Sequence, residues 1–363
     1  MSFFKKIFAP KEKPIKSYRD FWDWFQRNEK SFFKVVKSSG DIEKKFFKKL
    51  SPKLGELKDG YFFLTGMYDD HTVELIFTAD GNIKNIVFME EIVAHAPKIH
   101  GWKFTALKPA LGIENVNIHM AGYEFSSEKI FFYSNDHSDY PDEIDITLIH
   151  CDLTEENSRQ INIGTALFLD NYLGELAFVN NIDQYRVIGK DEAEKELVPI
   201  AKLKDFVNWR QKEFIEKYEE VYYETDDDEY SILEATSKNG NRLIAVINTS
   251  LLNWEGKASH PWIAEITFHF DGQEKNGMPH KKDYQQLDEV EDVLKERLSS
   301  NNGCLYLGRE TCPNERHVFF VCKDFRLPSK VFFDIQQDNN RLKPTYDIYK
   351  DKYWQSFENF RPK

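Results

Sequence analysis

The stretch HPWIAEITFHFDG, residues 260–272, decides the fold class of the C-terminal part of this chain. Apolar and polar residues alternate along it, which is typical of a β-strand with one face in a core. The face expected to be buried carries Trp262, Ala264, Ile266, Phe268 and Phe270. The opposite face carries Glu265, Thr267 and His269. The spacing therefore predicts a half-buried strand over residues 262–270.

The segments after this strand predict a complete small sheet. Residues 283–299 are predicted to form a helix, because Leu287, Val290, Leu294 and Leu298 recur at helical spacing. Strands are expected at 304–309 and 317–323, a shorter helix at 328–337 and a last strand from 346–349. The order βαββαβ is that of ferredoxin-like folds, in which two helices cover one face of a four-stranded antiparallel sheet. Upstream, Asn239-Gly240 predicts the turn of an added N-terminal hairpin.

The first half of the chain mixes helical and strand patterns. Aromatic residues recur at helical spacing in residues 17–37, and Ser17 three positions before Asp20 is a helix-start signal. Other helices are expected at 41–54, 83–95 and 158–172, and strands at 61–68, 72–79, 102–107, 115–120, 130–133 and 144–150. These patterns predict a mixed α+β module.

Charge is distributed unevenly along the 363 residues, whose formal net charge is −12. Residues 1–50 carry 14 Lys and Arg against 6 Asp and Glu, whereas ten acidic residues and one Lys lie between Glu213 and Glu234. Runs of like charge are solvated rather than packed. We therefore expect two modules with charged flanks. The predicted parts are a flexible basic arm at 1–16, the N-terminal α+β module at 17–204, a connecting helix and acidic junction at 205–229, and a ferredoxin-like module at 230–363.

Composition also restricts the class of protein. No run of 18 apolar residues is present, so no membrane span is expected. The acidic balance argues against nucleic-acid binding except through the basic N-terminal arm. Four Cys without a secretory leader indicate a reducing compartment, and we expect a cytoplasmic protein.

No motif in the sequence predicts catalysis. G-x-S-x-G, a glycine-rich phosphate loop and H-E-x-x-H are all missing. Asp69-Asp70-His71 and residues 136–139 do place His beside carboxylates, but in stretches where Asp and Ser serve turns. Cys304, Cys312 and Cys322 lie 8 and 10 residues apart, too far for a structural zinc pattern. We therefore expect no catalytic residue, metal or cofactor.

Metal binding by histidines is also weakly indicated. His269 and His317 are placed to meet across neighbouring strands. Two His without a carboxylate, however, are more often residues of a sheet surface.

Aromatic and cationic residues are the better candidates for contacts with a ligand or partner. They are Trp102, Lys108, Trp254, His260, Trp262 and Arg309. An Arg on a strand offers a planar fork to a carboxylate, and a Lys beside a Trp can contact an anion. The alternative is that the Trp side chains fill cores, Lys108 is solvated and Arg309 pairs on an exposed sheet face.

Several blocks of sequence resemble known families. His260-Pro261-Trp262, the helix with Leu287, Glu291 and Leu294, and Leu307-Gly308-Arg309 make residues 222–357 similar to the bacterial domain-of-unknown-function family 695. Phe21-Trp22-Asp23-Trp24-Phe25 and Gly101-Trp102-Lys103-Phe104 make residues 18–210 similar to a second uncharacterised bacterial family. Neither resemblance implies an activity. The first family is distantly similar to regulators of ribonuclease activity, which are acidic ferredoxin-like proteins that act by binding a protein.

Three functions remain open from the sequence. The first is a non-enzymatic module that binds another protein, as a regulator. The second is a small-molecule-binding protein or enzyme with a pocket between the two modules. The third is a regulator of RNA metabolism, which rests on the distant similarity to ribonuclease regulators and on the basic arm.

Overall fold

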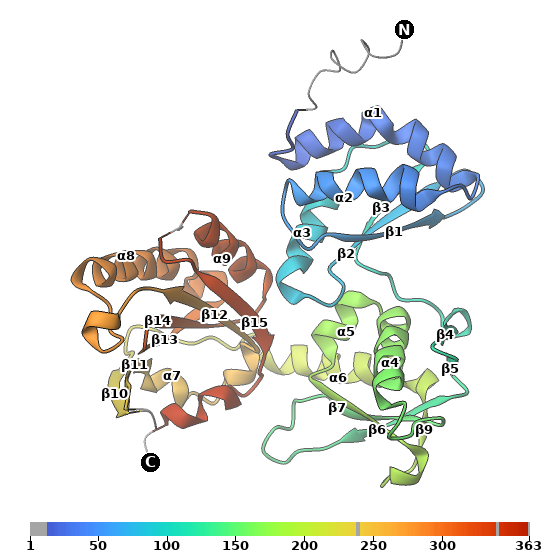
Figure 1. Cartoon of the computed structure of the whole chain (residues 1–363). Coiled ribbons are helices and arrows are strands. Elements are labelled where there is room, and N and C mark those ends of the chain that lie inside the picture. Colours follow the sequence, from blue (N-terminus) through green and yellow to red (C-terminus); the bar gives the residue numbers. More distant parts are fainter. Residues whose placement is uncertain (1–12, 237–239, 339–340, 362–363) are drawn as a thin grey trace. The chain divides into compact units, whose positions relative to one another are not determined.

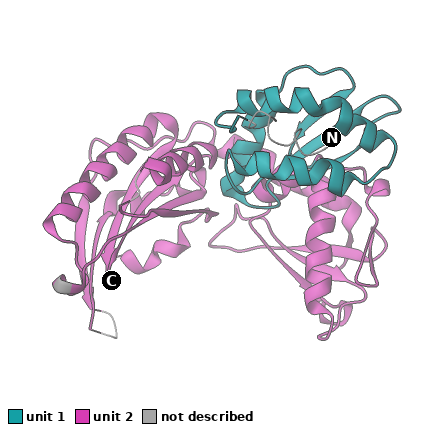
Figure 2. Cartoon of the chain, turned by 45° about the horizontal axis from the view of Figure 1, so that its top comes forward, with its two compact units in different colours: residues 1–108 teal, residues 109–363 magenta. Residues whose placement is uncertain are grey.

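The computed structural model describes residues 13–236, 240–338 and 341–361 (Figure 1). The chain divides into two compact units, residues 1–108 and 109–363 (Figure 2). The boundary falls inside the range 17–204, which the sequence predicts to be one module. Residues 1–12 of the predicted arm lie outside the described residues. Helices and strands occur in both units, which confirms the α+β class. None of the described helices combines the length and the apolar character that crossing a membrane requires.

The first unit is a small sheet with helices over it (Figure 1). Its strands are β1 (Phe62–Met67), β2 (Val73–Thr78) and β3 (Trp102–Ala106), and its helical elements are α1 (Tyr18–Lys37), a π-helical turn (Glu43–Phe47), α2 (Lys48–Gly55) and α3 (Ile83–Ala94). The hairpin of β1 and β2 is antiparallel, and β3 joins β2 in parallel. Ser17 caps α1 by accepting from the amide of Asp20. The aromatic face of α1 is buried, and Trp22 Nε1 donates to the carbonyl of Ile92 at 2.8 Å.

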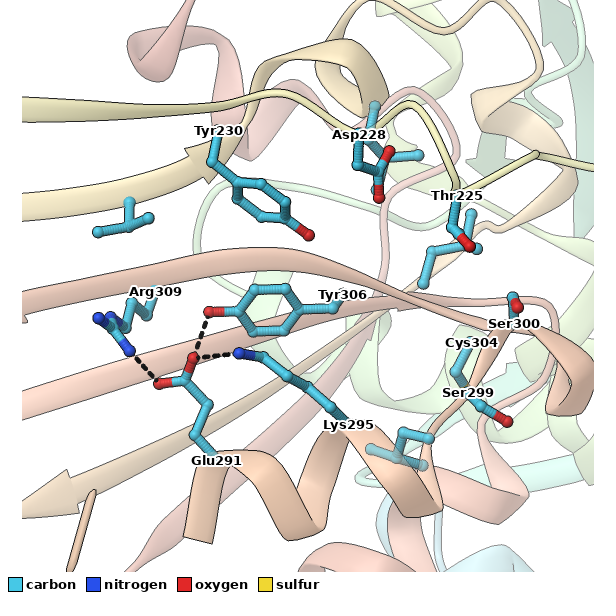
Figure 3. A pocket seen from close by; sticks show the side chains of 14 residues that line it. Thr225, Asp228, Tyr230, Glu291, Lys295, Ser299, Ser300, Cys304, Tyr306 and Arg309 are labelled. Atoms are coloured by element: carbon cyan, nitrogen blue, oxygen red, sulfur yellow. Dashed lines mark hydrogen bonds and ion pairs between the residues drawn. The ribbon is translucent and has the colours of Figure 1, made fainter. Parts of the chain in front are cut away.

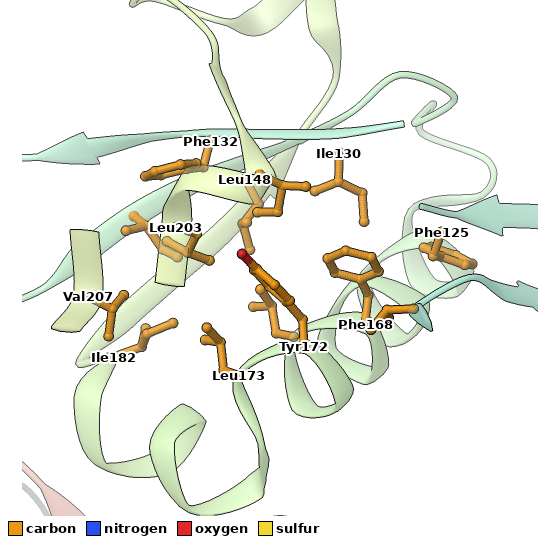
Figure 4. Packing of buried hydrophobic residues seen from close by; sticks show 14 of the residues in the cluster. Phe125, Ile130, Phe132, Leu148, Phe168, Tyr172, Leu173, Ile182, Leu203 and Val207 are labelled. Atoms are coloured by element: carbon orange, nitrogen blue, oxygen red, sulfur yellow. The ribbon is translucent and has the colours of Figure 1, made fainter. Parts of the chain in front are cut away.

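The second unit begins with a four-stranded sheet in the order β8-β7-β6-β9. Its elements are β4 (Ile118–Met120), β5 (Tyr123–Phe125), β6 (Ile130–Asn135), β7 (Asp145–His150), α4 (Ser158–Leu173), α5 (Glu175–Asn181), β8 (Gln184–Ile188), β9 (Val198–Pro199) and α6 (Leu203–Tyr218). Phe168, Tyr172 and Leu173 of α4 point at the apolar side chains of β6 and β7 (Figure 4). This packing forms a separate hydrophobic core.

The C-terminal part of the second unit is a six-stranded sheet in the order β10-β11-β13-β14-β12-β15. Its elements are β10 (Tyr230–Thr236), β11 (Arg242–Asn248), α7 (Thr249–Leu252), β12 (Trp262–His269), α8 (Lys281–Arg297), β13 (Cys304–Cys312), β14 (Glu315–Cys322), α9 (Arg326–Asp338) and β15 (Thr345–Lys350). Every strand pair in it is antiparallel. The predicted hairpin is confirmed by the pairing of β10 with β11. Asn239 of its turn lies outside the described residues, and Gly240 has a φ of +78°.

Strand β12 has the buried face that the sequence predicts, but it ends at His269, Phe270 is only half-buried, and Ile263 on the opposite face is buried as well. Trp262, Ala264, Ile266 and Phe268 form the fully buried face, on the side of the sheet that α8 and α9 cover. The opposite side has a second core, formed by apolar residues of the sheet, of α7 and of the last turn, including Trp354 and Phe357. The end of β15 also reaches the four-stranded sheet, where Lys350 and Lys352 form ion pairs with Asp183.

Candidate functional site

A hollow lies beside α8, and we call it the α8 hollow (Figure 3). Its volume is about 670 Å³. It is lined by Thr225, Asp228, Tyr230, Val246, Leu251, Glu291, Lys295, Leu298, Ser299, Ser300, Cys304, Leu305, Tyr306 and Arg309. These residues come from the acidic junction, the hairpin of β10 and β11, helix α7, helix α8 with the turn that follows it, and strand β13. Of the six predicted site residues, Arg309 lies in this hollow.

A β-bulge in β13 places Arg309 there. Tyr306 and Arg309 are three residues apart, and in a regular strand they would point to opposite faces. The pairing of β13 with β14 shifts register between Tyr306 and Gly308, so Leu307 is the extra residue of a bulge. Gly308 has a φ of +148°, and a Cβ on it would lie 2.3 Å from the carbonyl oxygen of Val246. Glycine is required here, and the bulge turns Tyr306 and Arg309 to the same helix.

Glu291 of α8 is the centre of the polar contacts in the hollow (Figure 3). Its side chain is 1% exposed. It accepts from Tyr306 Oη at 2.6 Å and Arg309 Nη1 at 2.9 Å, and it forms an ion pair with Lys295 Nζ at 2.8 Å. Burial acts to raise the pKa of Glu291, but Lys295, Tyr306 and Arg309 together lower it below its usual value. The carboxylate is therefore ionised and fully paired at neutral pH.

This arrangement suits binding better than acid–base chemistry. The charge of Glu291 is compensated by Lys295, Arg309 and, at 3.8 Å, Arg316, so this carboxylate is poorly placed to accept a proton from a substrate. Burial, followed by Asp228, raises the pKa of Tyr230 to about 12, so its hydroxyl stays protonated. Thr225, Ser299 and Ser300 add further hydroxyls to the lining. The α8 hollow therefore offers hydrogen-bond donors and acceptors to a polar group.

The acidic junction contributes to the same hollow. Asp226, Asp227 and Glu229 are exposed, as expected of a solvated run. Asp228, in contrast, accepts from Tyr223 Oη at 2.6 Å and lines the hollow. The prediction that this run cannot be packed is therefore wrong for Asp228, because a buried Tyr hydroxyl satisfies its carboxylate.

A second hollow of about 500 Å³ lies on the opposite face of the sheet, and we call it the sheet-face hollow. Its lining is largely apolar, with a polar group at one side. It comprises Leu233, Ala235, Leu243, Ala245, Glu265, Glu310, His317, Phe319, Tyr349, Ser356, Phe357, Asn359 and Phe360. Edge strand β10 contributes to both hollows, through Tyr230 on one face and Leu233 and Ala235 on the other.

The structure brings Cys312, Glu315 and His317 together beside the sheet-face hollow. One ligand atom from each lies within 4.8 Å of the others. The expectation that His269 and His317 lack a carboxylate partner is wrong. Glu265 lies 2.7 Å from His317 Nδ1, and Glu315 lies 3.1 Å from His269 Nδ1. The register of β12 on β14 creates the contact, because it pairs Thr267 with His317.

The two predicted residues of the first unit belong to its own framework. Trp102 begins β3, is buried, and donates from Nε1 to Glu29 at 3.2 Å. Lys108 forms an ion pair with Asp80 at 3.4 Å. Both residues therefore have partners within their own unit. For Trp102 this corresponds to the alternative in which the Trp side chains fill cores.

Trp254, His260 and Trp262 are buried or half-buried near the start of β12. Trp262 packs edge-on against Phe325, and Trp254 packs against Tyr223 and His260. Burial, followed by Lys323, lowers the pKa of His260 to about 3, so the ring is neutral. Its Nδ1 lies 2.8 Å from Ser259 Oγ. These three rings therefore support the fold and do not line the α8 hollow.

The prediction that Arg309 contacts a ligand or partner stays a prediction, whereas the alternative proposed for it is wrong. Arg309 does not pair on an exposed sheet face, because its partners Glu291 and Asp288 belong to α8. The residues that sequence reasoning missed are Glu291, Lys295 and Tyr306. Their signal was weak, namely a Glu and a Lys four residues apart on a helix, a spacing common on solvated faces.

Comparison with known proteins identifies one part of the chain. No curated protein and no solved structure matches the chain. The resemblance predicted for residues 18–210 stays a prediction. Residues 235–360 match the model of the Family of unknown function (DUF695), which confirms the family resemblance predicted for the C-terminal part of the chain.

Proposed function

We propose that this protein binds an extended segment of another protein, which adds as a strand to the outer edge of β10. Strand β10 ends the six-stranded sheet and, among the described residues, pairs with β11 alone. Its Ile232 is 70% exposed and Tyr230 is 45% exposed. An edge strand with exposed apolar side chains is a template for pairing with another chain.

The two hollows support this proposal because they lie on opposite faces of the sheet next to the same edge strand. Side chains of an added strand alternate between the faces. Those on the side of Tyr230 would approach the polar α8 hollow, and those on the side of Leu233 would approach the apolar sheet-face hollow. We therefore expect bound segments that alternate hydrogen-bonding and apolar residues. The position of β10 between the two hollows carries the proposal.

The proposal also includes the fold of the C-terminal part, the location of the protein and its role in the cell. We infer a ferredoxin-like core for β12–β15, α8 and α9, which the strand order β13-β14-β12-β15 and the βαββαβ sequence support. A cytoplasmic location fits the four free thiols, of which Cys304 and Cys322 face each other across two strands. A regulatory role is the function such a binding domain would serve.

A peptide-display selection on the full chain tests the proposal. Selected peptides are expected to alternate polar and apolar residues, and their binding is expected to protect backbone amides of 230–236 from hydrogen exchange. Ile232→Lys places a charge at the edge and should weaken binding by roughly tenfold or more, about 1.4 kcal/mol.

The matched control is Val293→Lys, because Val293 is an exposed β-branched residue on the outer side of α8. This variant should bind like the wild type. Peptides that bind Ile232→Lys equally well, or that protect amides away from β10, would exclude strand addition at this edge.

A further inference from the structure

The cluster at the turn between β13 and β14 has the composition and geometry of a metal site. Cys312 Sγ lies 3.5 Å from His317 Nε2, and Glu315 Oε2 lies 3.6 Å from the same nitrogen. We propose that Cys312, Glu315 and His317 bind one divalent transition-metal ion of the Zn²⁺ class. This site is separate from the edge of β10 and does not depend on the function proposed above.

The distances fit tetrahedral coordination. With Zn–S near 2.3 Å and Zn–N near 2.0–2.1 Å, two ligand atoms at a tetrahedral angle lie about 3.6 Å apart. The separations of 3.5 and 3.6 Å from His317 Nε2 match this spacing, and all three ligand atoms lie within 4.8 Å of one another. Thiolate, imidazole and carboxylate together favour Zn²⁺ over the hard cations Mg²⁺ and Ca²⁺.

A short hairpin turn fixes two of the three ligands. Cys312 and Glu315 are paired across the ladder and are separated by Pro313 and Asn314. Asn314 has a φ of +68°, and its side chain accepts from the amide of Gly272 at 3.0 Å. Its own amide donates to the carbonyl of Gly277 at 2.8 Å. The turn is therefore held from outside, and the two ligands need little reordering to bind an ion.

Outer contacts orient the other ligand atoms. Glu265 Oε1 lies 2.7 Å from His317 Nδ1, and Thr267 Oγ1 lies 3.0 Å from it. If the ring keeps its hydrogen on Nδ1 and a metal ion displaces the one on Nε2, the lone pair of Nε2 is directed at Cys312 and Glu315. A carboxylate behind a metal-binding His is the usual arrangement at such sites. His269 Nδ1, 3.1 Å from Glu315 Oε1, holds the second oxygen of that carboxylate.

The local charge also favours a cation. Glu265 and Glu315 surround the imidazole, and Glu310 is paired with His317 across the strands. Within the described parts of the chain, no Lys or Arg forms an ion pair with these three carboxylates. A bound dication would take the place of the proton that these neighbours stabilise on His317, whose pKa Cys312 and Glu265 raise to about 10.

Three protein ligands leave one coordination position open. His317 and Glu265 also line the sheet-face hollow, so we expect the open position to lie near that hollow. An open position is typical of zinc sites that bind water or a donor atom of a ligand.

Metal titration of the untagged full chain tests the proposal. After treatment with a chelator, equilibrium dialysis should give one Zn²⁺ per chain. Co²⁺ in place of Zn²⁺ should give the absorption band of a thiolate-to-metal charge transfer. Cys312→Ser should abolish this band and weaken Zn²⁺ binding by more than about 100-fold, beyond the usual cost of an outer-contact change. Glu265→Gln should weaken binding by roughly 10–100-fold and keep the stoichiometry at one.

Cys151→Ser is the matched control, because Cys151 is a partly exposed free thiol that directly follows β7. It should keep both the band and the affinity. The wild-type band answers the question even if a variant fails to fold. A wild-type chain that takes up no Zn²⁺ at micromolar concentration, or a Co²⁺ band that persists in Cys312→Ser, would overturn the proposal.

Discussion

Asp183 Oδ2 lies 2.7 Å from Lys352 Nζ, and this buried ion pair joins two sheets of the second unit. Lys350 Nζ adds a second contact, 2.6 Å from Asp183 Oδ1. The amide of Ile144 donates to the same carboxylate at 2.7 Å. Burial acts to raise the pKa of Asp183, but Lys350, Lys352 and this amide outweigh it and lower the pKa. The carboxylate is therefore ionised, and its two cations would be uncompensated without it.

Asp183→Asn is therefore expected to destabilise the protein strongly. Removing one partner of a buried ion pair costs about 3–5 kcal/mol, because the remaining charges stay buried. Denaturant unfolding of the variant measures the loss. Asp292→Asn, at an exposed position of α8, is the control and should change the free energy of unfolding by less than about 0.5 kcal/mol. Equal stability of the two variants would contradict this account of Asp183.

His260 makes the stability of the C-terminal domain depend on pH. Burial and Lys323 lower its pKa from 6.5 to about 3, so below pH 6.5 the unfolded chain binds a proton that the folded chain refuses. The contribution is present above pH 6.5 and is lost as the pH falls towards 3. Each unit in this window removes about 1.4 kcal/mol. The free energy of unfolding of His260→Asn should fall less steeply between pH 6.5 and 5 than that of the wild type. An imidazole signal of His260 that titrates near pH 6.5 would rule this out.

Glu291→Gln should show how much the centre of the α8 hollow contributes to folding. The substitution replaces the charged carboxylate by a neutral amide, so Arg309 and Lys295 lose the anion that they share. We expect a loss of about 2–3 kcal/mol, the usual range for hydrogen bonds to a charged group. Thermal or denaturant unfolding provides the measurement. Glu289→Gln on the exposed side of the same helix should remain close to the wild type, and a comparable loss there would show that Glu291 is not special.

Gly308→Ala should disrupt the bulge of β13. The methyl group would lie 2.3 Å from the carbonyl oxygen of Val246, and the backbone conformation is one that alanine rarely adopts. We expect a loss of at least about 1–3 kcal/mol from the backbone strain alone. Gly66→Ala in β1 meets no atom within 4 Å and is the control. If both alanines are tolerated equally, the bulge does not require glycine.

Local patterns in the sequence predict much of the C-terminal domain. The alternation in residues 262–270 reports one buried face, and β12 has that face in the structure. The step of apolar residues along α8 likewise matches its buried Leu287 and Leu294. In α1, both the cap at Ser17 and the aromatic face are read from residues close in sequence. These features succeed because each depends on neighbours within one or two turns.

Features that depend on distant pairing were not predictable in this way. The sequence shows the strands of residues 102–107 and 130–133 but not that the chain divides between them, at Lys108 and Pro109. The sequence indicates that Arg309 lies on a strand, but the bulge at Leu307 decides which face of the sheet it occupies. Glu265 and His317 are 52 residues apart, and only the register of β12 on β14 brings them together.

The order of synthesis gives the buried pair of Asp183 and Lys352 one more consequence. The two residues are 169 positions apart, so at usual translation speeds roughly 10–30 s separate their addition to the nascent chain. During that interval Asp183, directly before β8, has neither of its lysines. Its buried ion pairs can therefore form only after residues 350–352 have been synthesised.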